Sequence, residues 1–524
     1  MRTSALQYLY LQKPVSSVII ICAIALLPCL GNNFYTKGEA LEASVAALML
    51  ESGNWILPKT ASGEFTGKPP VAPWLMTLFS LPQGHVSKFT SRLPSAIAQI
   101  VLIGFVLAFF GKRTRFQEAF IATLLLITCP EIRRAGMTAY ADMLFATFVV
   151  LGLMQLYRWE NKLDLKGLPV IIPVLFSCAI LTEGFTGVVV PLLVFFVYLL
   201  ILRKYSLPKI IKALLYAGIS SMFIPVIWYA AAYKQGGYVF PDIILTGDFG
   251  RLFDLNPGDT GNAPGYVKSV LYNFGALLCG FIPWTVLFIF SLFGAKWRMP
   301  GKSFRQIMND ARNWFLSIEK VKRFSIVAAV CIIFFHTVLP GERSMYILSA
   351  YPFISILLAR YFIYITENRS KVTRIFAFVL TTTASIAFVA GILMMTHAVD
   401  FNAIIAGYTT NASILRPVES ITGTFASGHV INRIIMAFLL TSIITVIYQT
   451  TKRINIKILY ATILMTFCLN LFIDGIVMKG FGYDSFPVEQ TGHHLKTEKY
   501  CSPTNLIPEL PGPPADASMI ISPV

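Results

Sequence analysis

The placement of positive charge constrains the fold of this chain more than any other feature. Long apolar stretches alternate with connections, and Lys and Arg cluster in almost every second connection. Cytoplasmic loops of membrane proteins collect these residues, whereas loops on the outer face are poor in them. The pattern predicts an all-α polytopic membrane protein with a cytoplasmic N-terminus and an outer-face C-terminus.

Most of the apolar stretches have the roughly 17–25 residues that a helix needs to cross the hydrocarbon core. The third, fifth, sixth and ninth stretches are shorter. We predict about 13 transmembrane helices on this basis. They run near residues 16–32, 92–111, 117–130, 140–158, 168–182, 186–202, 212–231, 268–293, 325–340, 345–364, 374–396, 431–449 and 457–475.

Composition excludes several classes of protein. Of the 524 residues only 13% are charged and 56% are hydrophobic, whereas a soluble domain has about 25% charged residues. The net charge of +17 is explained by cytoplasmic loops that face anionic lipid head groups. We therefore expect the lipid bilayer as a partner and no nucleic acid. No His or Cys spacing indicates a metal site, and a requirement for a divalent cation is left open.

The chain divides into two parts. Residues 1–479 are predicted to form one transmembrane domain, in which the outer loops 33–91 and 233–266 build the site. Residues 480–524 are predicted to form a short, flexible tail on the outer face, because it ends in a Pro-rich stretch. Within the first loop, Gly38–Glu51 has helical spacing, and we expect it to lie in the membrane interface.

Some basic residues persist in the predicted outer loops, among them Lys68 and Arg251. An anionic ligand at the membrane surface, such as a lipid phosphate, would explain them. The first loop also holds three motifs in order, which are Gly38–Glu39, Met49–Pro58 and Gly67–Leu75.

The order of these motifs resembles the first outer loop of the GT-C membrane glycosyltransferases. It is most similar to the bacterial relatives of dolichyl-phosphate-mannose protein mannosyltransferases and of the lipid A aminoarabinose transferase. Further similar motifs are Arg92–Ala96, Arg133–Met137, Gly250–Phe253 and Arg343–Leu348. The resemblance covers roughly residues 30–365 and implies the GT-C fold. It also implies a polyprenyl-phosphate sugar as donor and a site on the outer face of the cytoplasmic membrane.

Transfer from a polyprenyl phosphate needs charge stabilisation of the leaving phosphate and a general base for the acceptor hydroxyl. We expect Glu39 to be the base, with Glu42 in reserve on the same helix face, and Lys68 and Arg251 to hold the donor phosphate. Asp142 would orient a basic partner or the acceptor. The remaining candidates, which we expect to line the same cavity, are Arg133, Arg134, Arg343 and Tyr346.

Each assignment has a simpler alternative. Glu39 could be an acid favoured by the dipole in the first turn of a helix, and Lys68 could reach toward the interface as other lysines do. Arg251 could be an ordinary loop charge, and Asp142 could form a structural pair with Arg134.

The chain also departs from the family pattern. Many relatives have Asp-Glu where this chain has Gly38–Glu39, and Glu183 and Glu342 stand where relatives commonly carry Lys. These departures leave a different donor, a different acceptor or an inactive relative open. We expect a hexosyl or pentosyl transferase that acts on a lipid, glycan or protein hydroxyl. The alternatives are a transporter or flippase of polyprenyl-linked substrates, or an inactive GT-C relative.

Overall fold

The computed structural model of the protein describes residues 14–60, 63, 65–66, 68–163, 167–237, 266–293, 303–338, 344–409, 412–426 and 429–480. Within these residues the regular structure is helical, and the β-pairing is one isolated bridge between Lys59 and Phe65. The all-α fold class is therefore confirmed. The predicted tail 480–524 lies outside the described residues apart from Gly480, at the end of helix α25.

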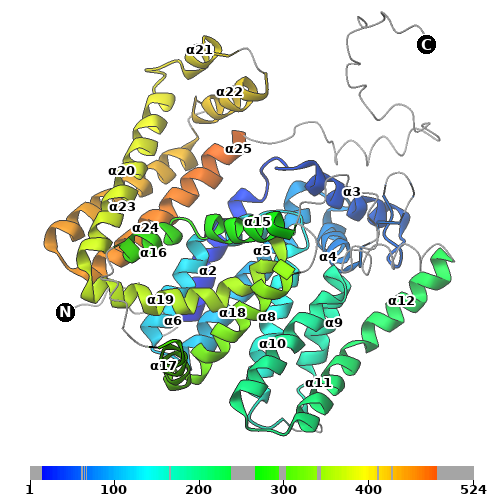
Figure 1. The fold of residues 1–524 in the computed structure, drawn as a ribbon. Helices are drawn as coiled ribbons and strands as arrows, with labels where there is room; N and C mark the ends of the chain where they lie inside the picture. The colour runs from blue at the N-terminus through cyan, green and yellow to red at the C-terminus, as the bar shows by residue number, and fades with distance from the viewer. Residues whose placement is uncertain are drawn as a thin grey trace, which may run out of the picture.

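A central group of helices packs together and is flanked on both sides (Figure 1). The central helices are α5 (Lys88–Gly111), α6 (Phe116–Thr128), α8 (Asp142–Trp159), α18 (Lys320–Val338) and α19 (Tyr351–Asn368). One flank consists of α9 (Ile171–Glu183), α10 (Thr186–Leu202), α11 (Leu207–Ser221) and α12 (Phe223–Gly236). The other flank consists of α20 (Ser370–Met395), α23 (Val430–Lys452) and α24 (Asn455–Phe472).

The remaining elements are mostly shorter, and α2 (Pro14–Leu26) packs against α5. They are α2 (Pro14–Leu26), η1 (Leu27–Cys29), α3 (Lys37–Ser52), α4 (Val71–Ser80), η2 (Leu81–Gln83), α7 (Pro130–Gly136), α15 (Tyr266–Gly280), α16 (Trp284–Phe293), α17 (Phe304–Ser317), η5 (Ser344–Ala350), α21 (Phe401–Ala406), α22 (Ala412–Ala426), the π-helix η6 (Ile473–Val477) and α25 (Met478–Gly480).

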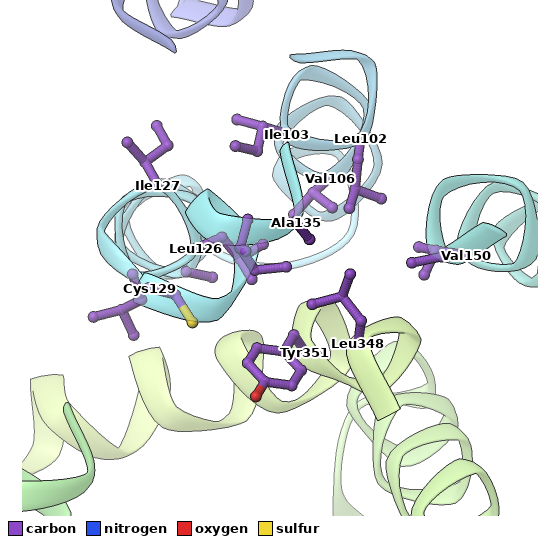
Figure 2. Close-up of a cluster of buried hydrophobic side chains, with 14 of the residues drawn as sticks. Leu102, Ile103, Val106, Leu126, Ile127, Cys129, Ala135, Val150, Leu348 and Tyr351 are labelled. Carbon is purple, nitrogen blue, oxygen red and sulfur yellow. The ribbon is translucent and has the colours of Figure 1, made fainter. Parts of the chain in front are cut away.

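The core lies where α5, α6 and α8 meet η5 and α19. Leu102, Val106 and Val150 point into the same layer as Leu348 and Tyr351 (Figure 2). These side chains are fully buried or nearly so. Such burial of aliphatic side chains fixes the helices on which the polar residues of the site are mounted.

The length and composition of the helices identify an integral membrane protein. Among the described residues, six helices are long and apolar enough to cross a membrane, or seven if one bent pair counts as a span. Pro14–Cys29, Phe116–Thr128, Ile171–Glu183 and Thr186–Leu202 are apolar but shorter. The predicted total of about 13 crossings stays a prediction, although helices are found at all 13 places.

The span predicted at 268–293 is bent, and whether it crosses the membrane once stays a prediction. It consists of two helices, because Val270–Gly280 and Trp284–Phe293 meet at an angle of 102°. Pro283 has no N–H to donate and so ends the helical ladder at this point. Gly280 is required at the bend, since a Cβ there would lie 2.2 Å from the hydroxyl oxygen of Tyr351.

The helical stretch predicted at Gly38–Glu51 is confirmed as α3. The side chain of Thr36 accepts the amide of Glu39 at the start of this helix, which is the usual N-cap arrangement. Gly53 ends the helix in the left-handed conformation, with φ of 68°. Helix α3 packs on α4 and α5, so the first loop is a packed part of the molecule.

Candidate functional site

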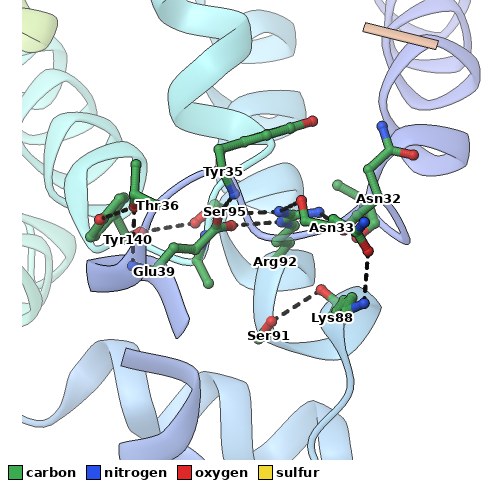
Figure 3. Close-up of polar contacts among 12 residues, drawn as sticks. Asn32, Asn33, Tyr35, Thr36, Glu39, Lys88, Ser91, Arg92, Ser95 and Tyr140 are labelled. Carbon is green, nitrogen blue, oxygen red and sulfur yellow. Dashed lines mark hydrogen bonds and ion pairs between the residues drawn. The ribbon is translucent and has the colours of Figure 1, made fainter. Parts of the chain in front are cut away.

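The first polar cluster joins the start of α3 to α5. Arg92 donates from Nε to Glu39 Oε1 at 2.6 Å and from Nη2 to Glu39 Oε2 at 3.1 Å. The amides of Tyr35 and Ala139 donate to the same carboxylate at 2.9 Å each. Arg92 also donates to the carbonyl oxygens of residues 30, 32 and 33. Figure 3 shows how this network ties the chain before α3 to α5.

The burial of this pair bears on the predicted role of Glu39. Both side chains are 0% exposed, and each carboxylate oxygen of Glu39 accepts two hydrogen bonds. An acceptor hydroxyl would have to displace one of these bonds before it could reach the carboxylate. The geometry thus favours a positioning role for Glu39, and its assignment as the base stays a prediction.

Helix α7 carries the second cluster. Arg133 Nε donates to Asp474 Oδ2 of η6 at 2.8 Å, which links residues 341 positions apart. Arg134 faces Glu131 on its own helix, with Nε–Oε2 and Nη2–Oε1 distances of 3.0 and 2.6 Å. Burial acts to lower the pKa of Arg134, but the hydrogen bonds and charge of Glu131 outweigh it, so this pKa is raised. Arg134 is therefore a permanent cation.

Asp142 begins α8 beside this cluster. Its Oδ2 lies 3.8 Å from Arg134 Nη2, so the structural pair considered above is present. The carboxylate is buried, and Oδ2 has no hydrogen-bond partner among the described residues. Glu183 and Lys68 lie close enough for their charges to act on it. Oδ2 of Asp142 can therefore accept a hydrogen bond from a ligand that reaches it.

The third group lies on the first loop. Lys68 donates from Nζ to Glu42 Oε1, and the side chain of Lys68 is 37% exposed. The chain between α3 and α4 is held by two indole groups, because Trp74 donates to the carbonyl of Trp55 and Trp228 to that of Ile56. The motif residues of this loop therefore have structural contacts of their own.

A cavity of about 510 Å³ borders the second cluster. Its charged wall residues are Glu131, Arg133, Arg134 and Asp474. Five wall residues carry hydroxyl groups, which are Tyr35, Thr36, Thr138, Tyr140 and Tyr351. The rest of the wall is mainly apolar and comes from α7, α15, η5, α19, α24, η6 and α25. One cavity thus combines an apolar wall with two guanidinium groups.

The predicted site residues are only partly brought together. Arg133 and Arg134 line the cavity, whereas Asp142, Lys68 and Glu42 are not among its wall residues. Asp142 lies 3.8 Å from Arg134, and Lys68 is paired with Glu42. Arg251 and Arg343 lie outside the described residues, as does the side chain of Tyr346. No group of three His, Cys, Asp or Glu residues in the described ranges is arranged to hold a metal ion.

Sequence reasoning missed three functional candidates. Arg92 appeared only as part of a motif, although it is the partner of Glu39. Glu131 could have been found, because it lies three residues before Arg134 on a short helix. Asp474 could have been noticed as a carboxylate at the end of the predicted span 457–475, but only the fold brings it to Arg133.

Three comparisons with known proteins bear on this site. The family model described as dolichyl-phosphate-mannose-protein mannosyltransferase matches residues 67–229. The crystal structure of ArnT from Cupriavidus metallidurans bound to undecaprenyl phosphate has a TM-score of 0.64 with 17% identity, and covers 91% of this chain and 78% of that one. The family match covers less than half of the chain, and the structural match shows that the chain is similar in fold to this ArnT.

Two sequence relatives agree with this relationship. The undecaprenyl phosphate-alpha-4-amino-4-deoxy-L-arabinose arabinosyl transferase of Enterobacter sp. (strain 638) is 21% identical over 353 residues, which are 66% of this chain and 59% of that protein. The arabinosyl transferase 2 of Proteus mirabilis (strain HI4320) is 25% identical over 218 residues, 40% of this chain and 38% of that protein. The matches span less than two thirds of either relative. The GT-C resemblance predicted from the sequence is confirmed.

Proposed function

We propose that this GT-C protein transfers a sugar from a polyprenyl-phosphate donor to a hydroxyl group of a lipid, glycan or protein. The site would lie on the outer face of the cytoplasmic membrane, with the N-terminus in the cytoplasm. The sugar would be a hexose or a pentose. The distribution of Lys and Arg supports this orientation, and the relatives' names support the class of donor.

The observation that carries the proposal is the cavity. Isoprenoid chains need apolar walls, and Leu277, Ile347 and Ile473 supply them. A phosphate needs cations, and Arg134 at the cavity wall and Lys68 on the first loop supply them. Arg133 is held by Asp474 and would complete the charged end. Arg251, Arg343 and Tyr346 are proposed as further contacts to the donor.

The reaction is a direct displacement at the anomeric carbon. Asp142 takes the proton of the acceptor hydroxyl, whose oxygen attacks the anomeric carbon as the bond to the donor phosphate oxygen breaks. The polyprenyl phosphate leaves with the bonding electron pair, and Lys68 and Arg134 stabilise its charge. Glu42 is the reserve base, because a phosphate that binds Lys68 would release the Glu42 carboxylate.

The proposal is tested by sugar transfer from synthetic undecaprenyl-phosphate sugars to native membrane extract. We expect transfer by the wild-type protein, at least 100-fold slower transfer by Asp142→Asn, and weaker donor binding by Lys68→Ala. Glu39→Gln distinguishes the role of Glu39 from that of Asp142. If Glu39 has a positioning role, this variant loses stability as well as activity. Binding of the lipid without transfer to any acceptor would contradict the proposal.

One observation favours a second candidate function. Broken helices mark the substrate sites of many transporters, and α15 and α16 form such a break beside the cavity. A flippase would move fluorescent undecaprenyl phosphate across the bilayer of proteoliposomes. A transferase without flippase activity would leave the lipid in its original leaflet.

A further inference from the structure

Two hydroxyl groups meet at the edge of the cavity. The side-chain oxygens of Thr36 and Tyr140 lie 2.6 Å apart, and both residues line the cavity. Thr36 is exposed and Tyr140 is half-buried. Figure 3 shows the two side chains facing one another above Glu39. They are therefore open to a ligand in the cavity.

The number of protons in this pair determines what it offers to a ligand. Thr36 Oγ1 already accepts the amide of Glu39 at 3.2 Å. Each hydroxyl has one proton, and one of the two protons is used in the bond between the side chains. Whichever group donates that bond, the other retains a proton to donate. The pair can thus always present one hydrogen-bond donor to the cavity.

A glycine makes room for this arrangement. A Cβ atom on Gly38 would lie 2.6 Å from Tyr140 Oη, whereas the next ring carbons would be 3.5 and 3.6 Å away. Only the hydroxyl oxygen therefore conflicts with a larger residue at position 38.

The charge of the cavity wall indicates the kind of atom that the pair would bind. Its two arginines are matched by Glu131 and Asp474, so the formal charges of the four groups cancel. The hydroxyl pair itself is neutral, because a tyrosine has an ordinary pKa of about 10. A neutral donor beside balanced charges suits an uncharged oxygen, such as a sugar hydroxyl.

We propose that the Thr36–Tyr140 pair, admitted by Gly38, donates a hydrogen bond to a hydroxyl or ring oxygen of the sugar on the polyprenyl-phosphate lipid. The pair is thereby a specificity determinant for the donor sugar. This inference rests on the proposed function, because it assumes that the cavity holds that lipid. It concerns recognition of the sugar, whereas Lys68, Arg133 and Arg134 are proposed to bind the phosphate.

The test compares lipids with and without a sugar. Purified full-length protein in phosphatidylcholine nanodiscs is titrated with undecaprenyl phosphate and with the same lipid carrying glucose, mannose or 4-amino-4-deoxy-L-arabinose. We expect the wild-type protein to bind at least one sugar-bearing form more tightly than the bare lipid. Tyr140→Phe removes the phenol donor and leaves the hydroxyl of Thr36, which is held at the N-cap of α3 by the amide of Glu39. It should reduce this preference about 5-fold, since the hydrogen bond from Tyr140 to the sugar is lost, and leave binding of the bare lipid unchanged.

A double-mutant cycle tests the glycine. In the wild-type background Gly38→Ala should remove the sugar preference as Tyr140→Phe does, because it displaces the hydroxyl. In the Tyr140→Phe background the same alanine should have no further effect on binding and should stabilise the helix, as alanine usually does relative to glycine. The matched controls are Gly423→Ala, where a Cβ meets no atom within 4 Å, and Tyr364→Phe at an exposed position.

The outcomes separate the two proposals. If the wild-type protein binds neither the bare lipid nor any sugar-bearing form, the proposed function fails and this inference fails with it. If the bare lipid binds but no sugar adds affinity, or Tyr140→Phe keeps the full preference, only this inference is overturned. Independent effects of Gly38→Ala and Tyr140→Phe would overturn the steric part of the argument.

Discussion

Two ion-pair clusters lie at opposite ends of α6, and they differ in the role that their charges can have. One surrounds Glu118 at the start of the helix, where Lys322 of α18 and Arg360 of α19 bind the same carboxylate. The other surrounds α7, which follows the end of α6. The helix has 13 residues, so the two clusters are about 20 Å apart.

The clusters differ in what lies beside them. The Glu118 cluster joins long helices, and none of its three residues lines the cavity that the described residues form. In the α7 cluster the partners come from short elements, such as η6 with Asp474, and they border about 510 Å³ of open space. Charges between long helices fasten the bundle, whereas charges on short elements beside a cavity are available to a ligand.

Glu39→Ala should have the largest effect on stability. It would leave the guanidinium of Arg92 buried without its carboxylate, and breaking a buried pair costs about 3–5 kcal/mol. We expect a marked fall in the melting temperature of the detergent-solubilised protein. Glu367→Gln, at an exposed position, is the control. A change in activity at unchanged stability would instead support Glu39 as the base.

Glu118→Ala should cost less. Arg360 is 51% exposed, so water can solvate it. Lys322 is buried, and among the described residues it would keep the carboxylate of Glu319 at 3.3 Å. We expect a loss of about 2–3 kcal/mol with unchanged affinity for undecaprenyl phosphate. If affinity fell while stability held, the two clusters would not be distinct in function.

Asp142→Asn should affect sugar transfer and leave stability nearly unchanged, in contrast to Glu118→Ala. The amide has nearly the same shape, and Oδ2 of Asp142 loses no hydrogen bond because it makes none with a described residue. We expect a change of less than about 1 kcal/mol in unfolding free energy and a loss of at least 100-fold in the transfer rate. If Asp142→Asn retains transfer, Glu42 becomes the proposed base, and Glu42→Gln is the variant that tests it.

Lys204→Met should have the smallest effect. Lys204 Nζ lies 3.3 Å from Glu160 Oε1 and its side chain is 45% exposed, and such pairs contribute about 0–1 kcal/mol. Neither lipid binding nor transfer should change. A large loss of stability would show that the exposure of an ion pair does not by itself determine its contribution to stability.

The sequence predicted most helices of the bundle, because apolar length is a local signal. It did not reveal the bend within 268–293, where Pro283 breaks an otherwise apolar run and only the packed structure shows the resulting angle. It also located Arg133, Arg134 and Asp142 near one another through their closeness in sequence. It could not find Asp474 as the partner of Arg133, or the place that Gly38 leaves for Tyr140, because these contacts join distant segments.

The central claim is that the cavity beside α7 holds a polyprenyl-phosphate lipid. The most direct test is photo-crosslinking of the wild-type protein in nanodiscs with undecaprenyl phosphate that carries a diazirine on its first isoprene unit. The account predicts labels on the cavity wall, at Leu277, Ile347 or Ile473, which excess unlabelled undecaprenyl phosphate removes. Labels confined to exposed positions such as Phe378 of α20, with no competition, would contradict it.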